Sequence, residues 1–179
     1  MMNRWLALFI AALLFAASLF VLLWNRPKPP PRPLSPPPEE RRLVRLFFAR
    51  EEGLAEENRL IRKRPTTVEE AKEAIWELIK GPSQRLSPTI PGGTKLLGVF
   101  IDAKGIAYVD FDRKIKEDHP GGSFGELLTV YSIVETLTAN FPEVKKVQIL
   151  IEGSEQETLA GHLDIRGPLA PRFSFQPGV

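Results

Sequence analysis

The sequence predicts an α+β protein in which two helices pack on one face of a small mixed β-sheet, preceded by one transmembrane helix. An apolar helical stripe over residues 123–141 leads into an alternating strand over 146–153. A second amphipathic helix over 67–80 precedes two probable strands at 95–102 and 105–112. Helices with one apolar face need a sheet to cover, which favours a two-layer arrangement.

The N-terminal segment predicts a membrane anchor over residues 1–25. The run from Trp5 to Trp24 carries no charge, and at ~1.5 Å per residue it spans the ~30 Å hydrocarbon core of a bilayer. A cleaved signal peptide is the alternative, but its apolar region is shorter and ends in small residues. Here the run ends in Phe20, Val21, Leu22, Leu23 and Trp24. We therefore expect a retained single-pass helix.

A Pro-rich linker is predicted over residues 26–40, which contain eight prolines. Proline fixes φ and removes N–H donors, so such a segment stays extended at about 3.1 Å per residue. We interpret it as a spacer between the anchor and a domain over 41–171, which is followed by a tail over 172–179. A ligand for a polyproline-binding domain is the alternative interpretation.

Composition excludes several function classes. The chain has no cysteine, so disulfides, thiolate metal sites, a thiol nucleophile and a lipid-modified N-terminal cysteine are all excluded. Four of the 24 basic and two of the 22 acidic residues precede Arg41, and the remainder balance to zero net charge. A neutral domain gives no support for nucleic-acid binding, which needs a basic face.

The domain opens with an alternating strand over 42–50, a loop over 51–57 and a second strand over 59–64 that pairs back. The basic run in 59–64 suggests either a site for an acidic partner or a charge-compensated hairpin. We favour the hairpin because acidic residues precede the run: Glu51, Glu52, Glu56 and Glu57.

Capping signals bound both helices. Thr67 with Glu70, and Ser123 with Glu126, have the spacing of a capping box. Gly81 and Pro82 end the first helix, and Pro142 ends the second. In the second helix we expect one broad buried face, with a polar side opposite it that contains Thr129, Ser132, Glu135, Thr136 and Asn140. A further short strand is predicted over 161–165.

The sequence offers few candidate chemical groups. His119 is expected in an exposed loop and His162 at a strand start, and neither has a second His at helical spacing for a metal. Asp110 and Asp112 lie two apart on a strand, so they could bind a cation or act as acid and base. Closing the strand end in solvent is the alternative that we favour.

The run from Gly92 to Lys95 has some features of a phosphate loop, but it lacks the upstream glycine spacing and precedes a strand. We therefore expect no catalytic, metal-binding or cofactor-binding residue and no enzyme. A hydrolase with its nucleophile among the serines and acids remains an alternative.

Six pieces of sequence, in this order, resemble the GerMN domain family. They are LIKGPSQ (78–84), IPGGTKL (90–96), GIAYVDF (105–111), ELLTVYSIVETLT (126–138), VQILIEG (147–153) and GHLDI (161–165), within a similarity from about Leu43 to Pro171. The resemblance implies a compact α/β unit akin to the ring-building modules of secretion and sporulation channels. It also implies export, with a lipid anchor or one membrane helix. Without cysteine, a helix must hold this chain, which has one copy of the domain.

The orientation follows from this resemblance. Arg26, Lys28 and Arg32 follow the apolar run and only Arg4 precedes it, so the positive-inside rule favours a cytoplasmic C-terminal part. The resemblance implies the opposite, a domain on the extracytoplasmic side of the cytoplasmic membrane, and we adopt that.

The functional expectation is a membrane-anchored, non-catalytic binding or scaffold module of the bacterial cell envelope, in a sporulation- or germination-related process. Its expected partners are other envelope proteins or further copies of itself, with no nucleic acid and no cofactor. A peptidoglycan- or small-ligand-binding module is the alternative.

Overall fold

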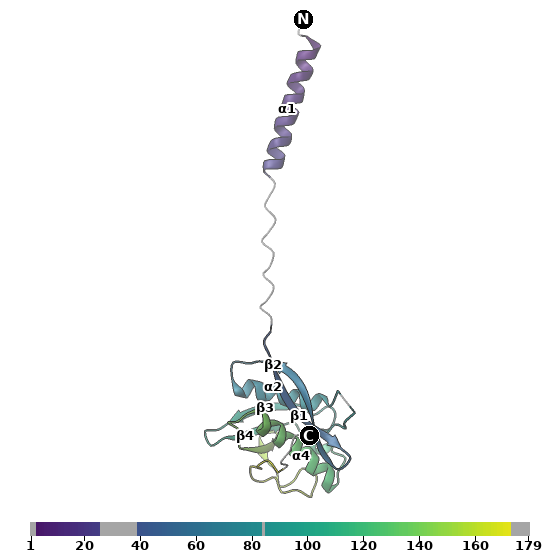
Figure 1. The fold of residues 1–179 in the computed structure, drawn as a ribbon, viewed down its shortest axis with the longest axis vertical. Helices are drawn as coiled ribbons and strands as arrows, with labels where there is room; N and C mark the ends of the chain where they lie inside the picture. The colour runs from purple at the N-terminus through teal and green to yellow at the C-terminus, as the bar shows by residue number, and fades with distance from the viewer. Residues whose placement is uncertain (1–2, 26–38, 84, 173–179) are drawn as a thin grey trace, which may run out of the picture. The chain divides into compact units, whose positions relative to one another are not determined.

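The computed structural model describes residues 3–25, 39–83 and 85–172, with the side chains of residues 4, 6 and 7 outside this set. The chain divides into two compact units, Met1–Pro37 and Pro38–Val179 (Figure 1). Of the linker predicted over 26–40 only Glu39 and Glu40 are described, and of the tail over 172–179 only Arg172. Both predictions therefore lie almost entirely outside the described residues.

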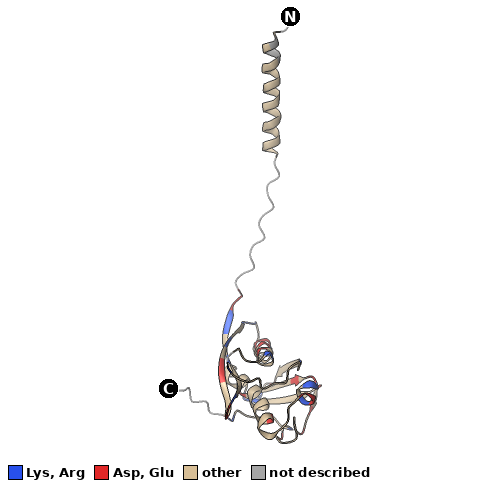
Figure 2. Cartoon of the chain, turned by 90° about the vertical axis from the view of Figure 1, so that its right-hand side faces the viewer, with Lys and Arg blue, Asp and Glu red and all other residues tan. Residues whose placement is uncertain are grey.

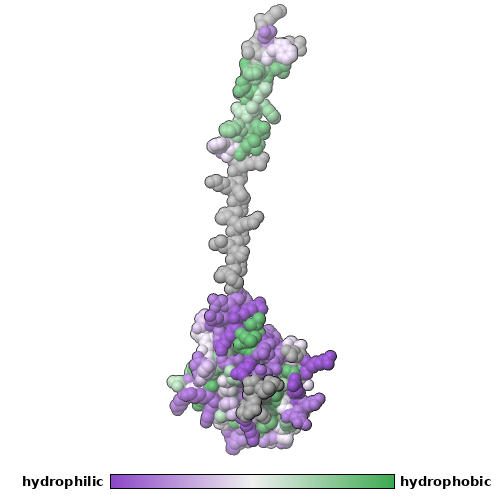
Figure 3. Space-filling view, in the orientation of Figure 1, coloured by the Kyte–Doolittle hydropathy of each residue, from purple (hydrophilic) through white to green (hydrophobic). Residues whose placement is uncertain are grey.

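The first unit contains α1 (Arg4–Trp24), a helix at the place where the sequence predicts one. Its large apolar side chains are exposed along its length, as the surface in Figure 3 shows. Among the described residues, no helix is both long and apolar enough to cross a membrane. The transmembrane span is therefore not confirmed.

The second unit is an α+β domain with two sheets, which confirms the predicted class. One sheet is the antiparallel hairpin of β1 and β2, and the other has the strand order β3-β4-β5-β6. Because β4 and β5 are parallel and the other neighbours antiparallel, the second sheet is mixed. The elements in chain order are β1 (Arg41–Arg50), β2 (Gly53–Arg62), α2 (Thr67–Lys80), β3 (Leu96–Ile101), β4 (Ile106–Phe111), α3 (Lys114–Glu117), α4 (Ser123–Asn140), β5 (Lys146–Ile151) and β6 (Ser154–Glu155).

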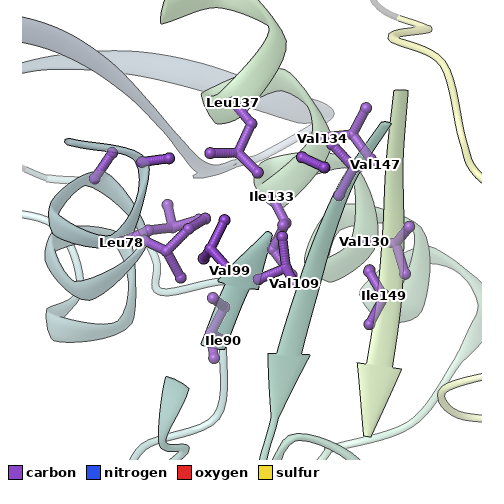
Figure 4. Close-up of a cluster of buried hydrophobic side chains, with 14 of the residues drawn as sticks. Leu78, Ile90, Val99, Val109, Val130, Ile133, Val134, Leu137, Val147 and Ile149 are labelled. Atoms are coloured by element: carbon purple, nitrogen blue, oxygen red, sulfur yellow. The ribbon is translucent and has the colours of Figure 1, made fainter. Parts of the chain in front are cut away.

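Helices α2 and α4 lie between the two sheets. Both helices contact β1, and α2 also contacts β3 while α4 contacts β5. Figure 2 shows the domain from a second side. Apolar side chains of the four-stranded sheet meet those of the helices in one core, which Figure 4 shows around Val109, Ile133 and Leu137. The hairpin thus forms a separate layer on the helices, which the sequence analysis did not foresee.

The hairpin corrects the prediction of a loop over 51–57. Strands β1 and β2 pair from Arg41 with Arg62 to Arg50 with Gly53, so only Glu51 and Glu52 form the turn. Acidic residues fit inside β2 because they have partners. Buried Glu57, for example, accepts hydrogen bonds from the backbone N–H and the hydroxyl of Ser83.

Both predicted capping boxes are wrong in detail. Helix α2 is capped one residue earlier, by Thr66, whose hydroxyl accepts a hydrogen bond from the Glu69 N–H at 3.3 Å. Helix α4 begins after Gly122, which has no side chain that could cap it, and Glu126 binds a distant loop instead.

The prediction of a single buried face on α4 is also wrong. Its expected polar side is buried as well, comprising Thr129, Ser132, Glu135, Thr136 and Asn140. The reason lies at the outer edge of β1, where the side chains of Thr136 and Asn140 bind backbone groups of the strand. A polar helix face here replaces a neighbouring strand.

The C-terminal part differs from the predicted strand over 161–165, which is irregular in the structure. Instead, Glu152 and Gly153, with φ of 49° and 75°, form a tight turn from β5 into the short strand β6. Farther on, Leu169 forms an isolated antiparallel bridge with Val147 of β5.

Candidate functional site

A groove of about 590 Å³ lies beside the tip of the hairpin. Three separate segments line it, namely the end of β1 with its turn, the segment after α2, and the first turns of α4. The lining residues are Ala49, Arg50, Glu51, Arg85, Leu86, Ser87, Phe124 and Leu128.

Backbone hydrogen bonds hold two walls of the groove together. The N–H of Ala49 donates to the carbonyl of Ser87 at 3.0 Å, and the N–H of Ser87 donates back at 2.9 Å. This bridge fixes the segment after α2 against the last residues of β1. Arg50 and Arg85, which flank the bridge, are thereby brought to one rim.

The groove combines an apolar floor with a cationic rim. Leu128 is buried, whereas the Phe124 side chain is 49% exposed. Arg50 and Arg85 are exposed, and within the described part of the chain neither side chain has an ion pair or hydrogen bond. Glu51 carries the one acidic group of the lining. Such a surface suits a ligand with an apolar body and a carboxylate.

A smaller hollow of about 250 Å³ lies on the outer side of α2. Its lining consists of Arg64, Glu69, Lys72, Glu73 and Trp76. The indole is 46% exposed, and Arg64 Nε donates to Glu73 Oε1 at 3.0 Å across the hollow. The hollow therefore offers one flat aromatic face beside charged groups.

The two aspartates predicted on one strand face bind backbone groups of neighbouring segments. Asp110 Oδ1 accepts the Gly153 N–H at 2.8 Å, and Asp112 Oδ1 accepts the Lys95 N–H at 2.9 Å. These contacts fit the interpretation that the pair closes strand ends. Among the described residues, no group of three or more His, Asp or Glu side chains is arranged to hold a metal ion.

His119 takes part in a hydrogen-bond chain that joins three segments. Its Nδ1 accepts the Gly121 N–H at 2.9 Å, so Nε2 carries the proton and lies 2.9 Å from the Thr129 hydroxyl. That hydroxyl lies 2.6 Å from the Thr89 carbonyl. Burial lowers the pKa of His119, against an opposing effect of the Glu126 carboxylate. His119 is therefore more enclosed than the exposed loop residue predicted.

Glu126, which the sequence predicts as part of a helix cap, is a fully buried acid. Its carboxylate is 0% exposed and accepts the backbone N–H groups of Leu159, Ala160 and His162 at 2.7, 2.8 and 2.8 Å. Burial raises the pKa of Glu126, but these hydrogen bonds outweigh burial and lower it overall. Glu126 thus fixes the 159–162 loop on α4, and no local sequence signal distinguishes this role from a cap.

The basic run over 59–64 is charge-compensated, as expected, although mostly by other acids than those predicted. Arg59 pairs with Glu57 and Glu77, and Lys63 Nζ lies 2.8 Å from Glu40 Oε2. The run Gly92 to Lys95 forms a turn, in which the Thr94 hydroxyl donates to the Pro91 carbonyl at 2.8 Å. The basic groups available to an acidic partner are therefore those at the groove rim, Arg50 and Arg85, and not those of this run.

The fold and sequence have clear relatives among solved structures. The first GerMN domain of the sporulation protein GerM from Bacillus subtilis is 25% identical, with a TM-score of 0.60 over 72% of this chain and 96% of that one. A candidate lipoprotein from Clostridium perfringens is 27% identical, with a TM-score of 0.53 over 73% of this chain and 87% of that one. The tandem GerMN domains of GerM, at 22% identity and a TM-score of 0.58 over 78% of this chain and 51% of that one, share the fold.

No curated protein matches this chain. The model of the Germane family, described as sporulation and spore germination, matches residues 45–157, which is more than half of the chain. This match covers most of the β1–β2 hairpin, helices α2 and α4, and the four-stranded sheet. The chain therefore belongs to the Germane family of sporulation and spore germination proteins, whose structural unit is the GerMN domain.

Proposed function

We propose that this protein is a membrane-attached, extracytoplasmic binding module of the bacterial envelope, working without catalysis in a sporulation- or germination-related process. The observation that carries the proposal is the groove beside the hairpin tip. There, Arg50 and Arg85 stand over an apolar floor without partners among the described residues. Unpaired guanidinium groups next to exposed aromatic surface are typical of interfaces.

The partner that fits this groove is a protein segment with an apolar side chain and an adjacent carboxylate. The apolar group would contact Phe124 and Leu128, and the carboxylate would take a two-pronged hydrogen bond from an arginine. Glu51 on the same rim would repel a purely anionic ligand, which favours a mixed segment.

Membrane attachment is proposed through α1. Its exposed apolar side chains include Leu8, Phe15 and Leu22, with Trp5 and Trp24 near its ends, where tryptophan favours membrane interfaces. The related candidate lipoprotein supports an envelope location in a broad sense. A helix in place of a lipid is consistent with the absence of cysteine from the sequence.

A role without catalysis is supported by the hydrogen bonds of the titratable groups, which join segments of the domain. Glu126, Asp110 and Asp112 each accept backbone hydrogen bonds that hold segments together. His119 is likewise engaged at both ring nitrogens. Each of these groups has a structural task, which favours a binding role for the domain.

The groove is tested by photo-crosslinking in intact cells. A benzophenone amino acid at Phe124 of the full chain should form a crosslink to one envelope protein. The double variant Arg50→Glu/Arg85→Glu should abolish this crosslink, whereas Arg41→Glu/Lys104→Glu, at exposed sites outside the groove, should keep it. No crosslink at Phe124, or one that survives the groove charge reversal, would refute the proposed site.

The membrane orientation is tested separately, with the native lack of cysteine as background. A single cysteine at Ser35 should react with a membrane-impermeant maleimide in intact cells. Labelling only after lysis would place the domain in the cytoplasm, as the positive-inside rule favours. That result would refute the extracytoplasmic part of the proposal.

Peptidoglycan is a second candidate ligand, favoured by the hollow at Trp76. An exposed indole beside Arg64, Glu69 and Glu73 provides a stacking face and hydrogen-bonding groups for a sugar ring. If this hollow binds glycan, Trp76→Ala should reduce co-sedimentation of the full chain with purified peptidoglycan. Phe100→Ala, which removes another exposed aromatic ring, should leave it unchanged.

A further inference from the structure

Strand β3 has one edge that no other segment of the described chain pairs with. Its bridge partners all lie on β4, and no hydrogen bond among the described residues reaches the backbone of Leu96–Ile101 from elsewhere. At the turn between β3 and β4, the Asp102 N–H donates to the Ile106 carbonyl. Because backbone groups alternate in direction along an antiparallel strand, Phe100 and Gly98 also direct theirs toward β4. Val99 and Ile101 therefore point their N–H and C=O groups outward.

The other sheet edges of the domain are protected. Thr136, Asn140 and Ser87 bind the outer edge of β1. Strand β5 has β6 and Leu169 along its second edge. The outer strand β2 contains charged residues, which oppose pairing with another chain: Glu56, Glu57, Arg59 and Arg62.

By contrast, β3 has the sequence LLGVFI and no charge. Phe100 is 62% exposed on the face away from the helices, where its ring lies 6.2 Å from the ring of Tyr108. Leu97 is exposed as well. An uncharged apolar edge strand is a ready site for a further strand.

We infer that β3 pairs antiparallel with β3 of a second copy of this chain, with the two-fold axis at Val99. The four-stranded sheets of the two copies would then join into one continuous sheet across the dimer. The outward N–H and C=O groups of Val99 and Ile101 would gain hydrogen-bond partners on the other copy. Such an interface is isologous, because each copy offers the same strand. The inference names one partner of the proposed binding module, but it uses a surface different from the groove.

Side-chain complementarity selects this register. With Val99 opposite Val99, Phe100 of each copy lies across from Gly98 of the other. A side chain at Gly98 would meet nothing within 4 Å, so there is room for the ring of Phe100 over this glycine. Aromatic residues stabilise glycine in a neighbouring strand in this way.

Charge at the ends of the strand selects the antiparallel direction. Lys95 precedes β3 and Asp102 follows it, with no charged residue between them. Antiparallel pairing brings the Lys95 end of one copy to the Asp102 end of the other, whereas parallel pairing would place like charges together.

The test uses a cysteine pair that can be crosslinked only in this arrangement. Lys95 and Ala103 are exposed and flank β3, Lys95 just before the strand and Ala103 in the turn after it. In the inferred dimer, the antiparallel register brings the Lys95 end of one copy near Ala103 of the other, whereas two copies of the same residue lie at opposite ends of the paired strands. The full-length variant Lys95→Cys/Ala103→Cys, in membranes, should give a dimer band with a short bis-maleimide, whereas each single-cysteine variant should not.

A further substitution in the double-cysteine background separates β3 pairing from association through α1. Phe100→Asp should reduce the dimer band at least tenfold. Leu60→Asp, at a residue 55% exposed on β2, should leave it unchanged.

Three results would overturn the inference: no crosslink in the double variant, equal crosslinking of the single variants, or crosslinks only to a different protein. The groove variant Arg50→Glu/Arg85→Glu should retain the dimer. Failure of the groove proposal and failure of the β3 pairing are therefore distinguishable.

Discussion

Asn140, the last residue of α4, binds both backbone groups of Arg45 in β1. Its Oδ1 accepts the Arg45 N–H at 2.9 Å, and its Nδ2 donates to the Arg45 carbonyl at 2.7 Å. A side-chain amide has the same donor and acceptor as a peptide, so Asn140 takes the place of one residue of a neighbouring strand. Thr136 continues the pattern at the N–H of Phe47.

Replacing Asn140 by alanine should destabilise the domain by about 2 kcal/mol, because two partly buried backbone groups lose their partners. Urea unfolding of the protein, followed by circular dichroism, measures this change. Asn58→Ala on the exposed side of β2 is the matched control and should cost less than about 0.5 kcal/mol. Equal effects of the two variants would contradict the proposed role of Asn140.

The substitution Glu126→Gln should destabilise the protein at pH 7 by about 2–3 kcal/mol, because an amide oxygen accepts N–H groups less strongly than a carboxylate does and the amide NH2 group cannot accept at all. The folded-state pKa of Glu126 is lowered, so its stabilising effect is present above the unfolded pKa of about 4.3 and is lost as pH falls through the folded pKa. Unfolding free energies measured from pH 7 to pH 3 should therefore fall less steeply in Glu126→Gln. Glu155 is exposed, so Glu155→Gln should leave the dependence of the unfolding free energy on pH unchanged.

A second pH dependence of the stability, at higher pH, is expected from His119. Its folded-state pKa is lowered by burial, so the neutral ring is favoured in the folded state and stability declines as pH falls below the unfolded pKa of about 6.5. Protonation would also place a hydrogen on Nδ1, where the Gly121 N–H now donates. The decline in melting temperature between pH 7.5 and 5.5 should be smaller in His119→Gln, and an unchanged decline would contradict this.

Gly105 is needed where the β3–β4 turn meets the segment before β5. It has φ of +81°, and an added Cβ would lie 2.6 Å from the Glu143 carbonyl oxygen. Gly105→Ala should therefore destabilise the domain by about 1–3 kcal/mol. Gly92→Ala, where an added Cβ meets nothing within 4 Å, should change the unfolding midpoint little.

The spacing of apolar residues along the chain correctly predicts the strands and helices whose apolar side chains face the core and whose polar ones face solvent. The strands over 95–102, 105–112 and 146–153 are found as β3, β4 and β5 within one or two residues, because their apolar residues alternate with others along the strand. The same holds for α2, with its clear apolar stripe. In β5 the second face is covered as well, since Gln148 is buried. These segments carry part of the family resemblance, which the family match confirms.

The remaining features depend on contacts that are distant in sequence. The first part of β2, up to Glu57, falls in the predicted loop, because the partners that bury Glu57 include Ser83, 26 residues away. The polar side of α4 looked exposed because only the fold brings β1 to Asn140, 95 residues away. The groove joins Arg50, Arg85 and Phe124 from three segments, so no local motif marks it.

The distance between Asn140 and Arg45 also bears on how the chain folds as it is made. The hairpin is synthesised first, yet the groups that cover the outer edge of β1 follow about 90 residues later. Until α4 has emerged, β1 presents a strand edge that other unfinished chains can pair with. Folding of this domain therefore depends on contacts of high sequence separation, which slows it.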